Sequence, residues 1–122
     1  MVKTTINHLL KKPKNFTDLD YISFLQRWIL VMSWIYYEHD FNIVADKQYD
    51  SVAYHLADLQ KGKHKGIVKD SEYGYVFYDF DGTTGFDLFH KLTEKDKKKL
   101  IHFACSVEES YRREIRKEKG RR

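Results

Sequence analysis

Two adjacent tyrosines and a downstream Asp-x-x-Tyr-Asp segment are the residues of this 122-residue chain whose types and spacing best suit ligand binding. If a helix begins near Asp46, the side chains of Asp46, Tyr49 and Asp50 are spaced i, i+3, i+4 and share one face. The connection before it turns that face back toward the tyrosine pair. Aromatic walls with two carboxylates suit a planar cationic heterocycle attached to a sugar, because rings attract the cation and acids accept from hydroxyl or amide donors. The predicted site comprises Tyr36, Tyr37, Asp46, Tyr49 and Asp50.

The order of these residues resembles the N-terminal helical subdomain of NAD-dependent DNA ligases. That subdomain carries Tyr-Tyr or Tyr-His, an eight-residue spacer, and then Asp-x-x-Tyr-Asp at the start of a helix; the resemblance here extends over residues 34–59. In the family this subdomain recognises the nicotinamide mononucleotide (NMN) half of NAD. The resemblance implies that Tyr36 and Tyr37 contact the nicotinamide ring, and that Asp46, Tyr49 and Asp50 hold the ribose, carboxamide or phosphate. NMN or NAD is accordingly the ligand that it implies.

The chain also departs from the ligase pattern. The spacer contains Asn42, Ile43 and Val44, whereas the family has a proline there. The ligase nucleophile is a lysine in Lys-x-Asp-Gly, but Asp79 occupies that place here, and a carboxylate cannot form a lysyl-adenylate. A chain of 122 residues is too short to add a nucleotidyltransferase domain. We therefore predict no catalytic residues and no enzyme activity: the protein binds NMN or NAD, or complements a ligase encoded elsewhere.

A structural interpretation of the tyrosine pair and Asp46 stays open, whereas a phosphatase-like motif elsewhere in the chain is set aside. The tyrosine pair could simply fill a core edge, with Asp46 as a helix cap. Residues 75–83 resemble the first motif of haloacid-dehalogenase-type phosphatases, in which an aspartate attacks phosphorus. That family needs a doubly wound sheet and a further acidic pair, whereas the 40 residues after Gly82 have the pattern of one helix. We interpret Asp81-Gly82 as a tight turn.

An alternative function uses a different surface, where aromatic side chains and carboxylates alternate. Tyrosine and phenylalanine are effective anchors for a protein partner, while the carboxylates would repel phosphate. Under this alternative the protein is a small phage-type effector that inhibits a host nuclease or defence system by contacting a host or phage protein in the bacterial cytoplasm. The predicted partner surface comprises Tyr73, Tyr75, Phe77, Asp79 and Asp81.

Positive charge is concentrated at the C-terminal end. Residues 93–122 hold 11 Lys+Arg against 6 Asp+Glu, although the net charge of the chain is +4. Acidic residues interleave with the basic ones, several at i±4, which favours pairing within a helix over a continuous track for phosphates. We expect at most weak, non-specific nucleic-acid binding, with Arg112, Arg113, Arg116 and Lys117 as the candidate contacts.

Periodicity predicts the elements that position these residues. Apolar side chains recur at helical spacing over 18–39, 46–61 and 93–117, with Thr17 or Asp18 and Thr93 as N-caps and Gly62 as a stop. Residues 73–80 carry strong β propensity, so a small β-hairpin or β element is expected within 66–82. The predicted fold is mainly α (α+β): one domain over 1–122, with an extended lead-in at 1–16, the ligase-like helix pair at 17–62, a β/turn segment at 63–92 and a basic C-terminal helix at 93–122.

Composition limits the class of protein. Hydrophobic residues make up 42% of the chain and aromatic residues 16%, which is enough for a folded core. A single cysteine excludes an intramolecular disulfide, and the six histidines lack metal-site spacing, so no metal is predicted. No apolar run approaches the roughly 18–20 residues of a membrane span. We expect a cytoplasmic protein without a membrane partner; no oligomeric state is predicted.

Overall fold

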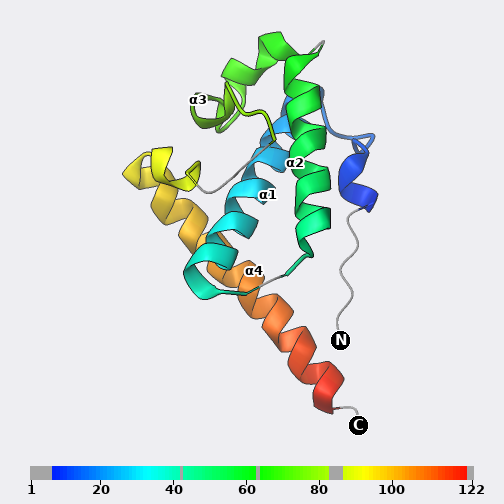
Figure 1. Ribbon diagram of the computed structural model, residues 1–122, viewed down its shortest axis with the longest axis vertical. Helices are drawn as coiled ribbons and strands as arrows, with labels where there is room; N and C mark the ends of the chain where they lie inside the picture. The colour runs from blue at the N-terminus through cyan, green and yellow to red at the C-terminus, as the bar shows by residue number, and fades with distance from the viewer. Residues whose placement is uncertain (1–6, 42, 63, 83–86, 121–122) are drawn as a thin grey trace.

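The helix α1 (Asp18–His39) forms the centre of the molecule. The computed structural model describes residues 7–41, 43–62, 64–82 and 87–120, without the side chains of 7 and 118–120. In it α1 packs against α2 (Asp46–Lys61) and α4 (Glu94–Gly120). Figure 1 shows α2 beside α1, α4 crossing α1, and the C-terminal turns of α4 extending beyond the rest of the molecule. The predicted mainly α class is confirmed.

The start of α1 follows from its capping residues. The Thr17 hydroxyl accepts from the Asp20 N–H at 3.0 Å, and the Asp20 carboxylate accepts from the Thr17 N–H at 3.1 Å, so two donors that lack helical partners are satisfied. The helix then buries side chains on most of its circumference, including Ile22, Leu25, Ile29, Leu30 and Ile35. It ends where Asp40 adopts a left-handed conformation with φ of 48°.

The other two long helices also agree with the predicted ranges. Ala45, rather than Asp46, is the N-cap of α2, and the Gln48 side chain accepts from the Ala45 N–H at 2.9 Å. Gly62 ends α2, with its N–H donating to the Asp58 carbonyl. The Thr93 hydroxyl accepts from the Asp96 N–H at the start of α4, which continues to Gly120, beyond the predicted end at 117.

The predicted β element is wrong for the described residues of 66–82. Those residues form a 3₁₀ helix, η2 (Lys65–Asp70), and a single helical turn, α3 (Gly74–Phe77). The buried side chains explain the difference: Tyr73, Val76, Phe77 and Phe80 are spaced i, i+3, i+4, i+7, which places them on one side of a helical path. The aromatic content suggested a strand, but its burial pattern is helical.

The lead-in is also more structured than predicted. Residues 7–10 form the 3₁₀ helix η1 (Asn7–Leu10), which lies against α2. Leu9 is buried, and the Tyr21 hydroxyl donates to its carbonyl at 2.6 Å. A further 3₁₀ turn, η3 (Phe89–Lys91), precedes α4. Residues 1–6 of the lead-in and 83–86 of the predicted β/turn segment lie outside the described residues.

A buried network of polar side chains attaches residues 65–77 to α1 and α2. The Gln26 amide donates to the Gln60 carbonyl oxygen at 3.0 Å and to the Ser71 hydroxyl at 2.9 Å, and it accepts from the Tyr73 N–H at 3.1 Å. The Gln60 amide in turn donates to the Phe77 carbonyl at 2.9 Å. Because buried polar groups must be paired, this network determines where the segment lies on the helix pair.

Candidate functional site

The predicted aromatic pair lies on the last turns of α1. Tyr36 is 40% exposed and Tyr37 51% exposed. Their rings contact each other edge to face, with centroids 4.9 Å apart and an interplanar angle of 75°. Both rings are therefore accessible to a flat ligand, although the two faces are turned to different directions rather than forming parallel walls.

Tyr49, by contrast, is half-buried and makes its contacts with other side chains of the protein. Its ring stacks on Trp28 with centroids 6.1 Å apart, and its hydroxyl hydrogen-bonds with the Ser33 hydroxyl at 2.7 Å. Burial raises the pKa of Tyr49 to about 12, and negative charge on Tyr37 and Asp50 adds to this shift. The hydroxyl is therefore neutral at physiological pH and already has a partner.

The two aspartates lie at the start of α2, and both are exposed. The three residues predicted to share one face of α2 are therefore used differently: Tyr49 points inward, whereas Asp46 and Asp50 face solvent. Asp50 is the next residue along the chain from Tyr49, and negative charge on Asp50 or Tyr37 is among the causes that raise the pKa of Tyr49. Of the five predicted residues, Tyr36 and Tyr37 are in direct ring contact on α1, and Asp46, Tyr49 and Asp50 share the first two turns of α2.

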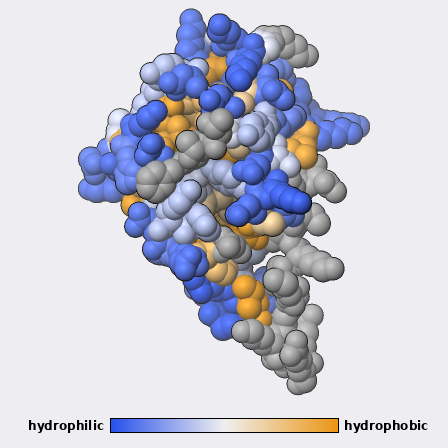
Figure 2. All heavy atoms as spheres, viewed as in Figure 1, coloured by the Kyte–Doolittle hydropathy of each residue, from blue (hydrophilic) through white to orange (hydrophobic). Residues whose placement is uncertain are grey.

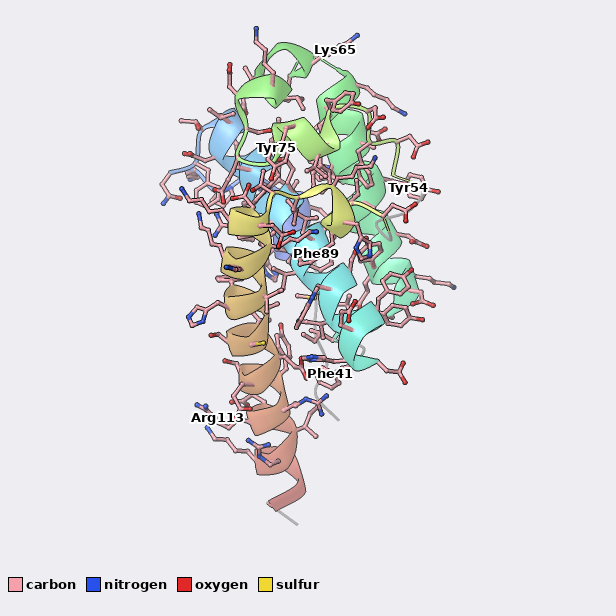
Figure 3. The ribbon with its side chains drawn as sticks, turned by 90° about the vertical axis from the view of Figure 1, so that its left-hand side faces the viewer. Phe41, Tyr54, Lys65, Tyr75, Phe89 and Arg113 are labelled. Carbon is pink, nitrogen blue, oxygen red and sulfur yellow. The ribbon has the colours of Figure 1, made fainter. Side chains whose placement is uncertain are left out.

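A small pocket adjoins Tyr37 on the side facing η3. It has a volume of about 150 Å³ and is lined by Ser33, Trp34, Tyr37, Glu38, Phe89 and His90. Figure 3 shows Phe89 where the chain enters α4, beside α1. Sequence reasoning missed this pocket because Phe89 and His90 follow α1 by about 50 residues and carry no local signal linking them to it.

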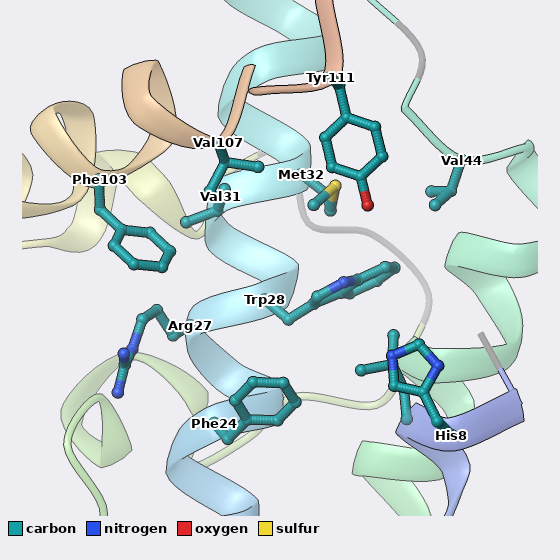
Figure 4. A pocket seen from close by; sticks show the side chains of 11 residues that line it. His8, Phe24, Arg27, Trp28, Val31, Met32, Val44, Phe103, Val107 and Tyr111 are labelled. Carbon is teal, nitrogen blue, oxygen red and sulfur yellow. The ribbon is translucent and has the colours of Figure 1, made fainter. Parts of the chain in front are cut away.

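A larger pocket, here called the Trp28 pocket, lies between α1, α4 and η1. It has a volume of about 310 Å³, within the lower range of small-molecule sites. Figure 4 shows Trp28 across its middle, with the Tyr111 hydroxyl pointing toward Trp28 from α4 and His8 on the η1 side. The remaining lining residues are Leu9, Phe24, Arg27, Val31, Met32, Val44, Phe103 and Val107. The sequence contained one signal for it, since the apolar face of α1 is too wide for a single neighbour.

A cluster of charged and aromatic side chains joins the end of α1 to the middle of α4. The buried Glu108 carboxylate accepts from His39 and from the Arg112 Nε, the latter at 2.7 Å, while the Arg112 guanidinium lies 4.2 Å from the centre of the Phe41 ring. Burial alone would raise the pKa of Glu108, but the hydrogen bonds from His39 and Arg112 outweigh it, and its pKa is lowered. Glu108 is therefore ionised at neutral pH and holds the two helices together.

The predicted partner surface is only partly available. Tyr73 and Phe77 are buried in the core, so a partner cannot contact their side chains; that part of the prediction assumed a strand and is wrong. Tyr75, Asp79 and Asp81 are exposed. The Tyr75 hydroxyl donates to Asp96 at 2.5 Å and thereby also supports the start of α4.

Two exposed tyrosines were not predicted. Tyr78 is 72% exposed and Tyr54 is 53% exposed. In Figure 3, Tyr54 lies on α2 and Tyr75 lies above the start of α4, so Tyr54 and Tyr75 do not form one patch. On the face seen in Figure 2, hydrophobic atoms form separate patches in a mostly hydrophilic surface. A single exposed aromatic such as Tyr54 is ordinary on a protein surface.

The candidate nucleic-acid contacts on α4 are all paired with glutamates of the same helix. Arg113 and Arg116 share Glu109, at 3.7 and 3.1 Å, and Lys117 lies 3.7 Å from Glu114. Together with Arg112 on Glu108, this is the intrahelical pairing that the interleaved charges predicted. The positive charge is therefore locally compensated rather than arranged as a continuous track.

Metal and membrane sites find no support in the described residues. No group of three or more His, Cys, Asp or Glu side chains among them is placed to hold a metal ion. Within the same residues, every helix falls short of the length and apolarity that crossing a bilayer requires. The chain matches no family model, no curated protein and no solved structure.

Proposed function

We propose that this protein is a non-catalytic binding module for a nicotinamide nucleotide, NMN or NAD, that acts alone or complements a ligase chain. The site is the junction of α1 and α2. The observation that carries the proposal is that the rings of Tyr36 and Tyr37 are exposed at the end of α1, while Asp46 and Asp50 are exposed at the start of α2, the next long helix along the chain.

The chemistry of these groups suits a pyridinium nucleotide. An exposed tyrosine ring attracts a planar cation through its π face, and nicotinamide carries that positive charge on its ring when attached to ribose. Carboxylates such as Asp46 and Asp50 accept hydrogen bonds from ribose hydroxyls or from a carboxamide. Tyr49 contributes as a support, because its bond to Ser33 and its stacking on Trp28 hold the start of α2 against α1. The proposal needs no nucleophile and no general base.

Calorimetric titration with NMN and with NAD tests this proposal. Tyr36→Ala and Asp50→Ala should each abolish or strongly weaken binding. Tyr54→Ala and Asp58→Ala are matched controls, because they remove the same exposed residue types from α2 away from its first turn; binding should survive them. Absence of heat at millimolar ligand, or equal loss in all four variants, would contradict the proposal.

A second candidate function is that of a protein-binding effector that blocks a host nuclease or defence system. It is favoured by Tyr78, the most exposed aromatic side chain among the described residues, which stands next to the exposed Asp79. Tyrosine beside a carboxylate is a common anchor in protein interfaces. Co-expression with a plasmid-targeting nuclease system in bacteria tests it: protection should require Tyr78 and Asp79 and should be unaffected by Tyr36→Ala. Protection lost equally in Tyr36→Ala would point back to the α1–α2 junction.

A further inference from the structure

The Trp28 pocket is formed by two apolar ridges that face each other. Phe24, Trp28 and Met32 follow one another at four-residue intervals on α1, and Phe103, Val107 and Tyr111 do so on α4. Side chains four residues apart stand above one another on a helix, so each helix presents a continuous ridge. The two ridges cross, as α4 crosses α1, and enclose an apolar pocket of about 310 Å³ that is large enough for a flat aromatic molecule.

The aromatic side chains of the pocket are less buried than the core beside them. Leu25 and Ile29 of α1 and Leu100 of α4 are fully or almost fully buried. Trp28, in contrast, is only half-buried, and Phe103 is 44% exposed. The helices thus pack tightly through one side and leave the aromatic ridges open. Covering such surface with an apolar ligand is favourable.

The charge of the lining favours an anion over a cation. Two of the eleven lining residues, Arg27 and His8, can carry positive charge, and none is an aspartate or glutamate. The Arg27 guanidinium lies 5.7 Å from the centre of the Phe103 ring, and one terminal nitrogen is 3.7 Å from Glu72. Its Nε is buried without a hydrogen-bond partner among the described residues. Because that Nε has no exposed surface, a ligand in the pocket would reach the guanidinium through its terminal nitrogens, which can donate charge-assisted hydrogen bonds to a carboxylate.

We propose that the Trp28 pocket binds a small planar aromatic carboxylate, with its ring between the ridges of α1 and α4 and its carboxylate at Arg27. This goes beyond the nicotinamide site and differs from it in charge preference. The junction of α1 and α2 offers carboxylates to a cation, whereas the Trp28 pocket offers a guanidinium to an anion. The Tyr111 hydroxyl, which points toward Trp28 in Figure 4, supplies a further polar group for a ring substituent.

A matched pair of probes tests the proposal: naphthalene-2-carboxylate and naphthalene-2-carboxamide have nearly the same shape and differ in charge. Binding is followed by NMR through the indole N–H signal of Trp28, which Trp34→Phe distinguishes from the other tryptophan of the chain. The carboxylate should shift the Trp28 signal and bind at least about 10-fold more tightly than the carboxamide, as expected for a charge-assisted hydrogen bond. Raising the salt concentration should reduce this preference.

Variants then assign the two parts of the site. Arg27→Gln should reduce the preference for the carboxylate to about twofold or less, with the carboxamide nearly unaffected. Arg113→Gln is the matched control, because it removes an exposed, glutamate-paired arginine of α4 outside the pocket lining, and it should preserve the preference. Val107→Trp should fill the pocket and abolish binding of both probes.

Four outcomes would overturn the proposal. They are equal affinity for both probes in the wild-type chain, a preference that persists in Arg27→Gln, binding retained in Val107→Trp, and no shift of the Trp28 signal at millimolar probe. If Arg27→Gln fails to fold, the salt dependence decides in its place: a carboxylate preference insensitive to salt in the wild-type chain would count against the guanidinium.

Discussion

Replacing Gln26 by leucine should lower the free energy of unfolding by about 3 kcal/mol, although the two side chains are similar in size. Gln26 is fully buried and makes three hydrogen bonds, to Gln60, Ser71 and the Tyr73 N–H. Leucine leaves the Gln60 oxygen and the Tyr73 N–H buried without these partners, at about 1–3 kcal/mol each. The Ser71 hydroxyl still donates to the Val68 carbonyl and loses less. The apolar gain of leucine offsets part of the loss.

The assay is urea unfolding followed by far-ultraviolet circular dichroism, with the double variant included. Gln60→Leu removes the oxygen that Gln26→Leu orphans, so the two losses should fall short of additivity by about 1–2 kcal/mol, as for residues in one network. Gln48→Leu is the matched control: its side chain accepts from an exposed N–H that water can reach, so its loss should stay below about 1 kcal/mol. A loss under about 1 kcal/mol for Gln26→Leu, or strict additivity, would refute the reasoning.

Three further predictions concern the Glu108 cluster between α1 and α4, the close approach of the chain at Gly74, and the basic helix α4. The pKa of Glu108 is lowered in the folded protein, so the carboxylate stabilises the fold fully above the ordinary pKa of 4.5, and this stabilisation is lost as the pH falls through the lowered pKa. Glu108→Gln should therefore flatten the acid side of the profile of unfolding free energy against pH. Gly74→Ala would place a Cβ 2.1 Å from the Val68 carbonyl oxygen, so it should lower the melting temperature by several degrees, whereas Gly66→Ala meets nothing within 4 Å and should be tolerated. Duplex DNA should bind α4 only at roughly micromolar affinity or weaker, with steep salt dependence in fluorescence anisotropy; nanomolar affinity at about 200 mM salt would show that the paired arginines are available to phosphates.

Most of the helical framework could be predicted from the sequence because its signals are local. Thr17 and Thr93 accept hydrogen bonds from residues three positions later, and Gly62 ends α2 through a bond to a residue four positions earlier. Apolar periodicity over each long helix is likewise read within a few turns. Such contacts form between neighbours in the chain and depend little on what the rest of the molecule does.

The segment before α4 shows where local signals failed. Tyr73 and Phe77 have high β propensity, but a strand needs a partner strand, and the described residues around them form helical turns instead. The backbone is directed by the Gln26 network and by burial of Tyr73, Val76 and Phe77 over α1 and α2. These contacts span about 45 residues of sequence, so propensity within the segment could not anticipate them.

The features of the candidate sites also fall into two groups, those set by local helix boundaries and those set by the packing of helices against one another. The exposed tyrosine pair and the acidic start of α2 are placed by the helix boundaries, and the sequence alone determined those. The inward turn of Tyr49, the contact of Glu108 with His39 and the Trp28 pocket depend on how α1 meets α2 and α4. Side chains from residues 24–32 and 103–111 form one pocket only after the helices pack, because burial of apolar surface brings together ridges that the chain separates by some 70 residues.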